Sequence, residues 1–269
     1  MKTKIQINIV LLGIILIFFN SCKEKSNNYH YIYDNYDISE ILQLDSFVNV
    51  EFGIENLNNW SQRNIYGYIG ENKQRFFIKF NSVKKSTTNS AEYYVCGKTM
   101  VKNNICNFQG KMIFNPETYE VIAPKDITQP KGSSILLLNG KYEFFENHNQ
   151  NYSGFFEGNF SISLLKFDNS DKLYYDISNF CADGFSNLGF IGTWTDYKTL
   201  KSKKCNWGDY RIPESEGLDI GIPEFLPDAK YSKYGWRSFV EAYGYSEDIT
   251  SLDREIAREE EQEYKDKLK

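Results

Sequence analysis

Side chains alternate between two faces along much of 91–194, with the period of two that β-strands show. The clearest case is a predicted hairpin that turns at Asn103 and Asn104, since Asn tolerates the positive φ of a two-residue turn. This turn pairs Gly97 with Gly110 and places mostly apolar residues on one face, with most of the polar residues on the other. The pattern predicts consecutive antiparallel strands.

A second predicted hairpin turns within 147–151 and pairs Gly140 with Gly158. Facing glycines in both hairpins favour strong curvature or closure into a barrel, because large side chains collide at a sharply coiled corner. A bulge, or an aromatic side chain that lies over the gap, is the alternative explanation. Further strands are predicted at 47–54, 65–69, 75–80, 119–122, 173–180 and 189–197.

Helical spacing replaces the strand pattern near the C-terminus. Asp228 is a predicted N-cap, apolar residues then recur at helical spacing, and Gly244 ends the segment. A second helix is predicted from about Ser246, and its mostly charged part beyond Ile256 is expected to project into solvent. The fold class is therefore mainly β: an antiparallel meander in a strongly curled or barrel-like sheet, with one or two C-terminal helices.

Composition fits one large β domain or a β domain with an appendage, because 16% of the 269 residues are aromatic and all-β domains often reach about 200 to 250 residues. The net charge is −5, and removal of a leader that contains Lys2 and Lys4 but no acid lowers it by two, to −7. General binding to the phosphate backbone of nucleic acids is therefore not expected.

Lys2 and Lys4 precede an unbroken run without polar side chains, 9–19, and Ser21 and Cys22 follow. This is the pattern of an export signal, and the run is shorter than the about 20 residues that span a bilayer. The Ser21–Cys22 pair resembles the lipobox of Gram-negative bacterial lipoproteins, in which the Cys is lipidated and becomes the mature N-terminus. An ordinary secretory signal followed by an unrelated Cys is the alternative.

This resemblance implies an envelope protein that is anchored to a membrane through a lipid on Cys22. Lys23 at the next position is more similar to outer-membrane lipoproteins than to lipoproteins retained in the inner membrane. The expected organisation is a signal peptide (1–21), a lipidated tether (22–36), a β-rich domain (37–244) and a charged C-terminal helix (245–269). A short helix is predicted at 38–44.

Four cysteines remain besides Cys22, an even number for an oxidising compartment. The first hairpin places Cys96 and Cys106 on opposite faces, too far apart for a disulfide. A bond between Cys181 and Cys205 is therefore predicted, and free buried thiols are the alternative.

Gly192, Thr193 and Trp194 are followed by Thr-Asp-Tyr, and both triplets are similar to lipocalin signatures. In lipocalins the first signature opens the first strand and the second comes much later, whereas here they adjoin near the end of the sheet. We therefore retain only the physical expectation that Trp194 closes one end of a curled sheet.

The segment after 204 is rich in aromatic and charged residues that could contact a ligand, and we predict a ligand site there. Trp207 could stack on a ligand, Asp209 could accept hydrogen bonds, and Tyr210 and Arg211 add a ring and a forked donor. Together with Trp194 these are the candidate ligand-binding residues. The alternative is structural: Trp207 plugs a barrel end, and Asp209 pairs with Arg211 or a turn amide. The carboxylates Glu214, Glu216, Asp219 and Glu224 follow without EF-hand spacing.

Catalysis has little support in the sequence. His30 and His148 are the only histidines, and no phosphate-binding glycine loop is present. No catalytic residue, cofactor or metal is therefore assigned. The preferred function is non-catalytic binding of a small apolar or glycan ligand, or of a protein partner, in the cell envelope. A cavity lined by Tyr142, Phe156 and Phe160 would favour a ligand.

Two alternatives remain open. One is a carboxylate-based hydrolase acting on glycans with two of Asp183, Asp209, Asp219 and Glu224. The other is a purely structural interaction protein of the envelope.

Overall fold

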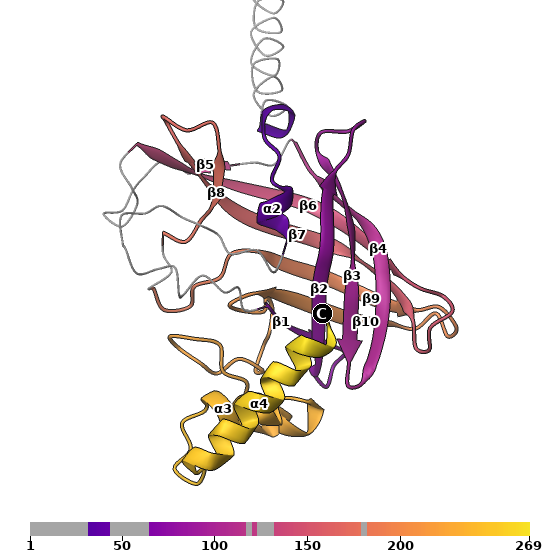
Figure 1. Cartoon of the computed structure of the whole chain (residues 1–269), viewed down its shortest axis with the longest axis vertical. Coiled ribbons are helices and arrows are strands. Elements are labelled where there is room, and N and C mark those ends of the chain that lie inside the picture. Colours follow the sequence, from indigo (N-terminus) through magenta and orange to yellow (C-terminus); the bar gives the residue numbers. More distant parts are fainter. Residues whose placement is uncertain (1–31, 44–64, 117–119, 123–131, 179–181) are drawn as a thin grey trace, which may run out of the picture.

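Eight strands close into an antiparallel barrel in the computed structural model, which describes residues 32–43, 65–116, 120–122, 132–178 and 182–269 (Figure 1). The strands of the barrel are β1 (Ile65–Ile69), β2 (Gln74–Lys85), β3 (Glu92–Val101), β4 (Asn104–Phe114), β6 (Ser133–Glu146), β7 (Gly154–Phe167), β9 (Gly189–Asp196) and β10 (Ser202–Asp209). Each pairs with the next of these strands along the chain, and β10 pairs with β1 to close the ring. The predicted barrel-like meander is confirmed.

Two short strands extend the sheet beside the β6–β7 hairpin. β5 (Glu120–Ile122) pairs with β6, and β8 (Leu173–Tyr175) pairs with β7, where β4 and β9 no longer reach. The strand predicted at 173–180 is therefore shorter than expected. The strand predicted at 47–54 lies outside the described residues.

Both predicted hairpin registers are wrong by two residues. The first turn consists of Lys102 and Asn103, with Lys102 at φ 56°, so that Gly97 pairs with Phe108 rather than with Gly110. In the second hairpin Gly140 pairs with Phe160 rather than with Gly158. A shift of two residues leaves every side chain on its predicted face, because the strand period is two.

Aromatic rings lie over the glycines of both hairpins. A Cβ atom on Gly97 would lie 2.7 Å from ring carbons of Phe108, and one on Gly140 would lie 2.5 Å from ring carbons of Phe160. The predicted facing of glycine on glycine is therefore wrong, and Gly97 and Gly140 each lie opposite a phenylalanine whose ring occupies the space of a Cβ atom. The sheet nevertheless closes into a barrel.

The strand β10 was not predicted. Its residues Ser202 to Asp209 contain the cluster that we interpreted as a loop, and they pair with both β9 and β1. The exposed Lys203 and Lys204 precede the inward Cys205 and Trp207, and the buried polar Asn206 lies between those two, so that the strand has no simple apolar alternation.

Aromatic side chains fill the barrel interior. Trp207 is fully buried at its centre, stacked on Phe190 with ring centroids 4.8 Å apart and edge-on to Tyr142 at 5.1 Å. Phe156 lies 6.1 Å from Trp207, and Phe160 lies 5.7 Å from Phe190. Tyr142, Phe156 and Phe160, the predicted lining of a ligand cavity, are thus part of the packed core.

The segment 32–43 packs on one end of the barrel and includes α2 (Ser39–Leu42), the predicted short helix. The rings of Tyr33 and Phe114 lie 5.4 Å apart, and Lys85 donates hydrogen bonds to the carbonyl oxygens of Tyr33 and Tyr36. The expectation that the tether extends to residue 36 is therefore wrong, because Ile32 and Tyr33 are already buried.

Three helical segments form a C-terminal module: a 3-10 helix (Ala229–Tyr234), α3 (Arg237–Tyr243) and α4 (Ser251–Lys267). The Asp228 side chain accepts a hydrogen bond from the Lys230 amide, which confirms the N-cap. The second helix begins later than predicted, with a capping box between Thr250 and Asp253.

The expectation that α4 projects into solvent is wrong. Figure 1 shows α4 (yellow) beside α3 below the barrel, with its C-terminal end beside β2. Its buried Glu261 receives two hydrogen bonds from Arg75 on β2, at 2.6 and 2.5 Å, and a third at 2.5 Å from Ser238 on α3. The Arg75 guanidinium also lies 4.5 Å from the ring centre of Phe77, whose ring contacts Tyr264 of α4. Arg75 therefore fastens α4 to the barrel wall.

Candidate functional site

The predicted ligand-binding residues of β9 and β10 belong to the scaffold. Trp207 and Asp209 are fully buried, and Trp194 is 7% exposed. Tyr175 donates a hydrogen bond to the Asp209 carboxylate at 2.5 Å, and the Arg211 guanidinium pairs with Asp219. Trp207 fills the barrel centre rather than a barrel end. These three side chains therefore have no surface to offer a ligand.

Arg211 organises the loop that follows β10. Its guanidinium donates to the carboxylate of Asp219 and to the carbonyl oxygens of Gly221 (3.1 Å) and Ile222 (2.7 Å). Asp219 also accepts from two backbone amides of the same loop. Tyr210 is half-buried at φ 62°. The structural interpretation of this cluster is supported, with partners that the sequence did not indicate.

The downstream carboxylates do not converge on a common point. Glu214 pairs with Lys204 at 2.7 Å, and Glu216 pairs with Lys73 at 3.5 Å. Asp183 and Glu224 are exposed. In the described part of the chain, no three His, Cys, Asp or Glu side chains are placed to hold a metal ion.

Three described cysteines are free thiols: Cys96, Cys106 and Cys205. The predicted disulfide through Cys205 is therefore not formed, and Cys181 lies outside the described residues. Cys96 is exposed and Cys106 is buried, as the opposite faces of the first hairpin require, and Cys205 on β10 is also buried. Burial raises the pKa of Cys106 to about 11 and that of Cys205 well above its ordinary value.

This difference predicts selective labelling. Maleimide at neutral pH should modify Cys96 in the native protein, and Cys106 and Cys205 only after unfolding, because the reactive thiolate needs solvent access and burial raises the pKa of the latter two thiols. Mass spectrometry of peptides from labelled protein measures this. Recovery of Cys205 in a disulfide-linked peptide would contradict the arrangement.

Four rings form a row on the outer wall, at the end of the barrel that carries the β6–β7 loop. Phe145 and His148 are exposed, and Phe155 and Tyr197 are half-buried. Phe145 on β6 stacks on Phe155 on β7 (6.1 Å, 25°), Phe155 lies 6.0 Å from Tyr197, and Tyr197 stacks on His148 (4.0 Å, 30°). We call Phe145, Phe155, Tyr197 and His148 the aromatic row. Phe145 is 45% exposed, an unusual position for a phenylalanine.

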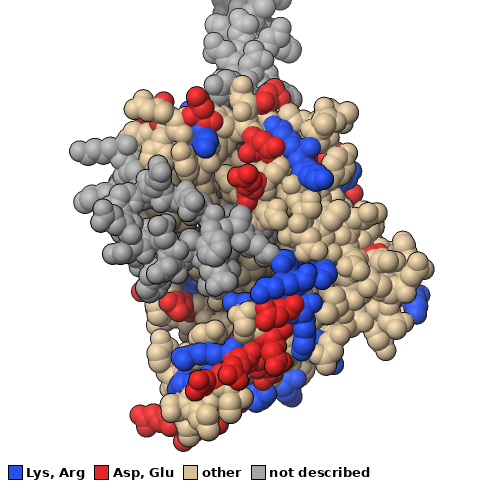
Figure 2. Space-filling view, in the orientation of Figure 1, with Lys and Arg blue, Asp and Glu red and all other residues tan. Residues whose placement is uncertain are grey.

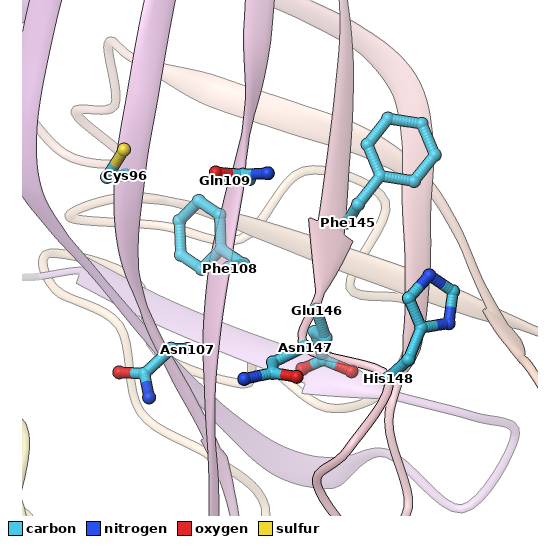
Figure 3. A pocket seen from close by; sticks show the side chains of 8 residues that line it. All are labelled: Cys96, Asn107, Phe108, Gln109, Phe145, Glu146, Asn147 and His148. Atoms are coloured by element: carbon cyan, nitrogen blue, oxygen red, sulfur yellow. The ribbon is translucent and has the colours of Figure 1, made fainter.

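A surface pocket of about 380 Å³ adjoins this row (Figure 3). Figure 3 shows Phe145 and His148 on one side of it, and Asn107 and Gln109 of β4 toward the other side, where Cys96 of β3 lies. Within the described residues the side-chain amides of Asn107 and Gln109 have no hydrogen-bond partner. The pocket volume lies in the range of small-ligand sites, about 300 to 1,000 Å³. It offers unpaired amides next to an exposed ring.

A buried carboxyl group lies beneath the row. Glu146, 5% exposed, accepts hydrogen bonds from the Thr99 hydroxyl, from the Trp194 indole N–H (3.0 Å) and from the Gly154 amide (2.8 Å). Burial raises its pKa, against the opposing effect of these bonds. Its carbonyl oxygen accepts a bond from the Tyr197 hydroxyl at 3.2 Å, so the residue connects the core to the aromatic row.

The sequence did contain a signal for this surface. Phe144–Phe145 and Phe155–Phe156 are pairs of consecutive phenylalanines in alternating strands, and only one member of such a pair can face the core. His148 was noted only as a predicted loop residue. The proximity of Tyr197 depends on barrel closure.

Among the described residues no helix is both long and apolar enough to cross a membrane. Comparisons with protein-family models, with curated proteins and with solved structures found no match to this chain.

Proposed function

We propose that the protein is a lipid-anchored protein of the cell envelope that binds a glycan on its outer wall, at the aromatic row. The stack of four rings beside unpaired amides is the observation that carries this proposal. It replaces the barrel interior as the proposed place of binding, because the interior is packed.

The chemistry of the row suits a sugar. A pyranose ring has an apolar C–H face that packs on an aromatic ring, and its hydroxyl groups donate and accept hydrogen bonds. Side-chain amides such as those of Asn107 and Gln109 also donate and accept. Figure 2 shows few charges over the wall around β3 and β4, whereas charged residues gather over the C-terminal helices. A neutral glycan fits these properties better than a charged ligand.

The anchor is proposed from the N-terminal sequence. The export-signal pattern that ends at Cys22 supports acylation of that residue, and Lys23 supports the outer membrane as the destination. Acyl chains would then hold the domain at the membrane, in the periplasm or at the cell surface. The proposed binding role needs no cofactor.

A glycan hydrolase is less well supported. It needs two carboxyl groups on either side of a bound sugar, about 5 to 10 Å apart. Asp209 is buried in a bond with Tyr175, and Asp219 is occupied by Arg211. Glu146 lies beside the pocket, but it is buried beneath three hydrogen bonds.

Replacement of Phe145 by Ala should weaken glycan binding about tenfold, equivalent to about 1.4 kcal/mol, because it removes the most exposed phenylalanine of the row. Calorimetric titration of the full-length protein with cellohexaose and chitohexaose measures the change. These probes are neutral, and only the second has acetamido groups.

The matched control is Tyr94→Ala, which removes an aromatic side chain of similar exposure (51%) from β3, outside the row. This variant should bind as tightly as the wild type, and both variants should unfold at the wild-type temperature. Equal affinity of the Phe145 variant and the wild type would contradict the proposal. So would a wild-type protein that binds neither oligosaccharide nor insoluble envelope polysaccharide.

A further inference from the structure

The turn between β9 and β10 holds a leucine in a fixed, exposed position. Leu200 is 74% exposed and adopts φ 55°, a conformation that is uncommon for a bulky residue. Asp196 fixes the turn, because its carboxylate accepts hydrogen bonds from the amides of Lys198 (2.9 Å) and Thr199 (2.7 Å). Its carbonyl oxygen also accepts a bond from the Leu200 amide at 2.9 Å. Glycine or asparagine suits this backbone better, and the fold gains no burial from the leucine.

Lysine side chains surround this leucine. Lys198 and Lys201 lie on either side of it in the turn, and Lys203 follows near the start of β10. All three are exposed, and none forms an ion pair with a carboxylate in the described part of the chain. We call Lys198, Leu200, Lys201 and Lys203 the basic tip. It combines an exposed apolar side chain with positive charge.

The outward face of α4 has the opposite charge. The helix packs through Ala257 and Glu261, which are buried. Leu252 (63% exposed) and Ile256 (55% exposed) are four residues apart and therefore share the outward face. Figure 2 shows acidic side chains in a line where Figure 1 draws α4. The other members of this face, which we call the acidic face, are Glu255, Glu259 and Glu263, and within the described residues none of them forms an ion pair.

The basic tip and the acidic face are complementary. Each presents exposed aliphatic side chains beside charges of one sign, and the two signs are opposite. Apolar residues that adjoin each other on a helix surface commonly mark an interaction site. No described segment covers Leu200, Leu252 or Ile256. Because both surfaces belong to the same chain, a second copy carries the partner that each of them lacks.

We propose that the protein associates with itself head to tail, with the basic tip of one copy docked on the acidic face of the next. The two surfaces differ, so the contact is heterologous and builds rings or open chains rather than a two-fold dimer. The tip is small, which places the contact among weak interfaces, below about 1,200 Å² of buried surface. The association is therefore reversible and sensitive to salt. It does not depend on glycan binding.

Sedimentation velocity of the full-length protein tests the role of the leucine. The wild type should form oligomers that grow with protein concentration at low ionic strength and dissociate in about 1 M salt, where the Debye length is about 3 Å. Leu200→Asn should weaken the association about tenfold. This variant should unfold at no lower temperature than the wild type, because asparagine tolerates the left-handed conformation. Undiminished association of the Leu200→Asn protein would overturn the inference.

Charge reversal tests which surfaces meet. Lys198→Glu with Lys201→Glu makes both surfaces acidic, whereas Glu255→Lys with Glu259→Lys makes both basic. Each double variant alone should stay monomeric, and an equimolar mixture of the two should associate, because every surface then meets one of opposite charge. A mixture that stays monomeric would contradict the pairing, as would a wild type that is monomeric at every concentration. Binding of such a monomer to phosphatidylglycerol vesicles would instead identify an anionic membrane as the partner of the basic tip.

Discussion

Replacement of Trp207 by alanine should destabilise the protein by about 3 to 5 kcal/mol, the usual cost of truncating a large buried aromatic side chain. Trp207 is fully buried and contacts the rings of Phe76, Tyr142, Phe156 and Phe190 from four strands. Its removal leaves a cavity at the point where the barrel walls meet. Urea unfolding monitored by circular dichroism measures the loss.

This unfolding measurement distinguishes a structural role of Trp207 from a ligand-binding role. Trp207→Phe is the matched control, since it keeps a ring in the core and should cost less than the alanine variant. Tyr94→Ala, on the outer wall, should leave stability within about 0.5 kcal/mol of the wild type. A Trp207→Ala protein with wild-type stability and no glycan binding would contradict the structural role of Trp207 and support a role in ligand binding.

Replacement of Glu261 by alanine should destabilise the attachment of α4 by about 3 to 5 kcal/mol, because it leaves the Arg75 guanidinium buried without its partner. Both side chains are only 6% exposed, so solvent screens their interaction little. The measurement is the unfolding transition of the full chain, followed together with hydrogen exchange of the α4 amides. Exchange in α4 should accelerate most.

The double variant Arg75→Met with Glu261→Met gives the control. Apolar side chains of similar length remove both charges, and such replacements of buried pairs are often neutral or stabilising. The double variant should therefore be more stable than Glu261→Ala. If the alanine variant unfolds like the wild type and its α4 amides exchange no faster, α4 is not held by this pair.

Much of the sheet could be predicted because strand alternation is a local property. The faces of β3, β4, β6 and β7 were correct although both turns were placed wrongly. The first error arose because Lys102, not an asparagine, adopts the positive φ of the turn. The preference of asparagine for tight turns does not fix where a turn forms. In this protein Phe108 packs over Gly97, in a register that differs by two residues from the one that Asn103 and Asn104 indicated.

The closing strand could not be recognised from its own residues. β10 is a polar segment with one tryptophan. It pairs with β9, and its pairing with β1, which precedes it by more than a hundred residues, closes the barrel. The interpretation of the ligand cluster had the same difficulty. Residues such as Trp207 and Asp209 suggested a binding loop, although closure of the barrel buries them.

The contacts that anchor α4 and the segment 32–43 could not be predicted from the sequence either. Arg75 and Glu261 are 186 residues apart, and both look like ordinary surface charges in their local patterns. Ile32 and Tyr33 occur in a stretch without periodicity, where burial has no local signal. The aromatic row likewise combines residues from three separate segments.

The central claim is that the barrel interior is packed, so that ligands bind on the outer wall. A crystal structure of the protein solved under xenon pressure tests it most directly, because xenon enters empty apolar cavities. We predict no xenon among Tyr142, Phe190 and Trp207. Xenon atoms bound between these rings would show an interior cavity and would contradict the account.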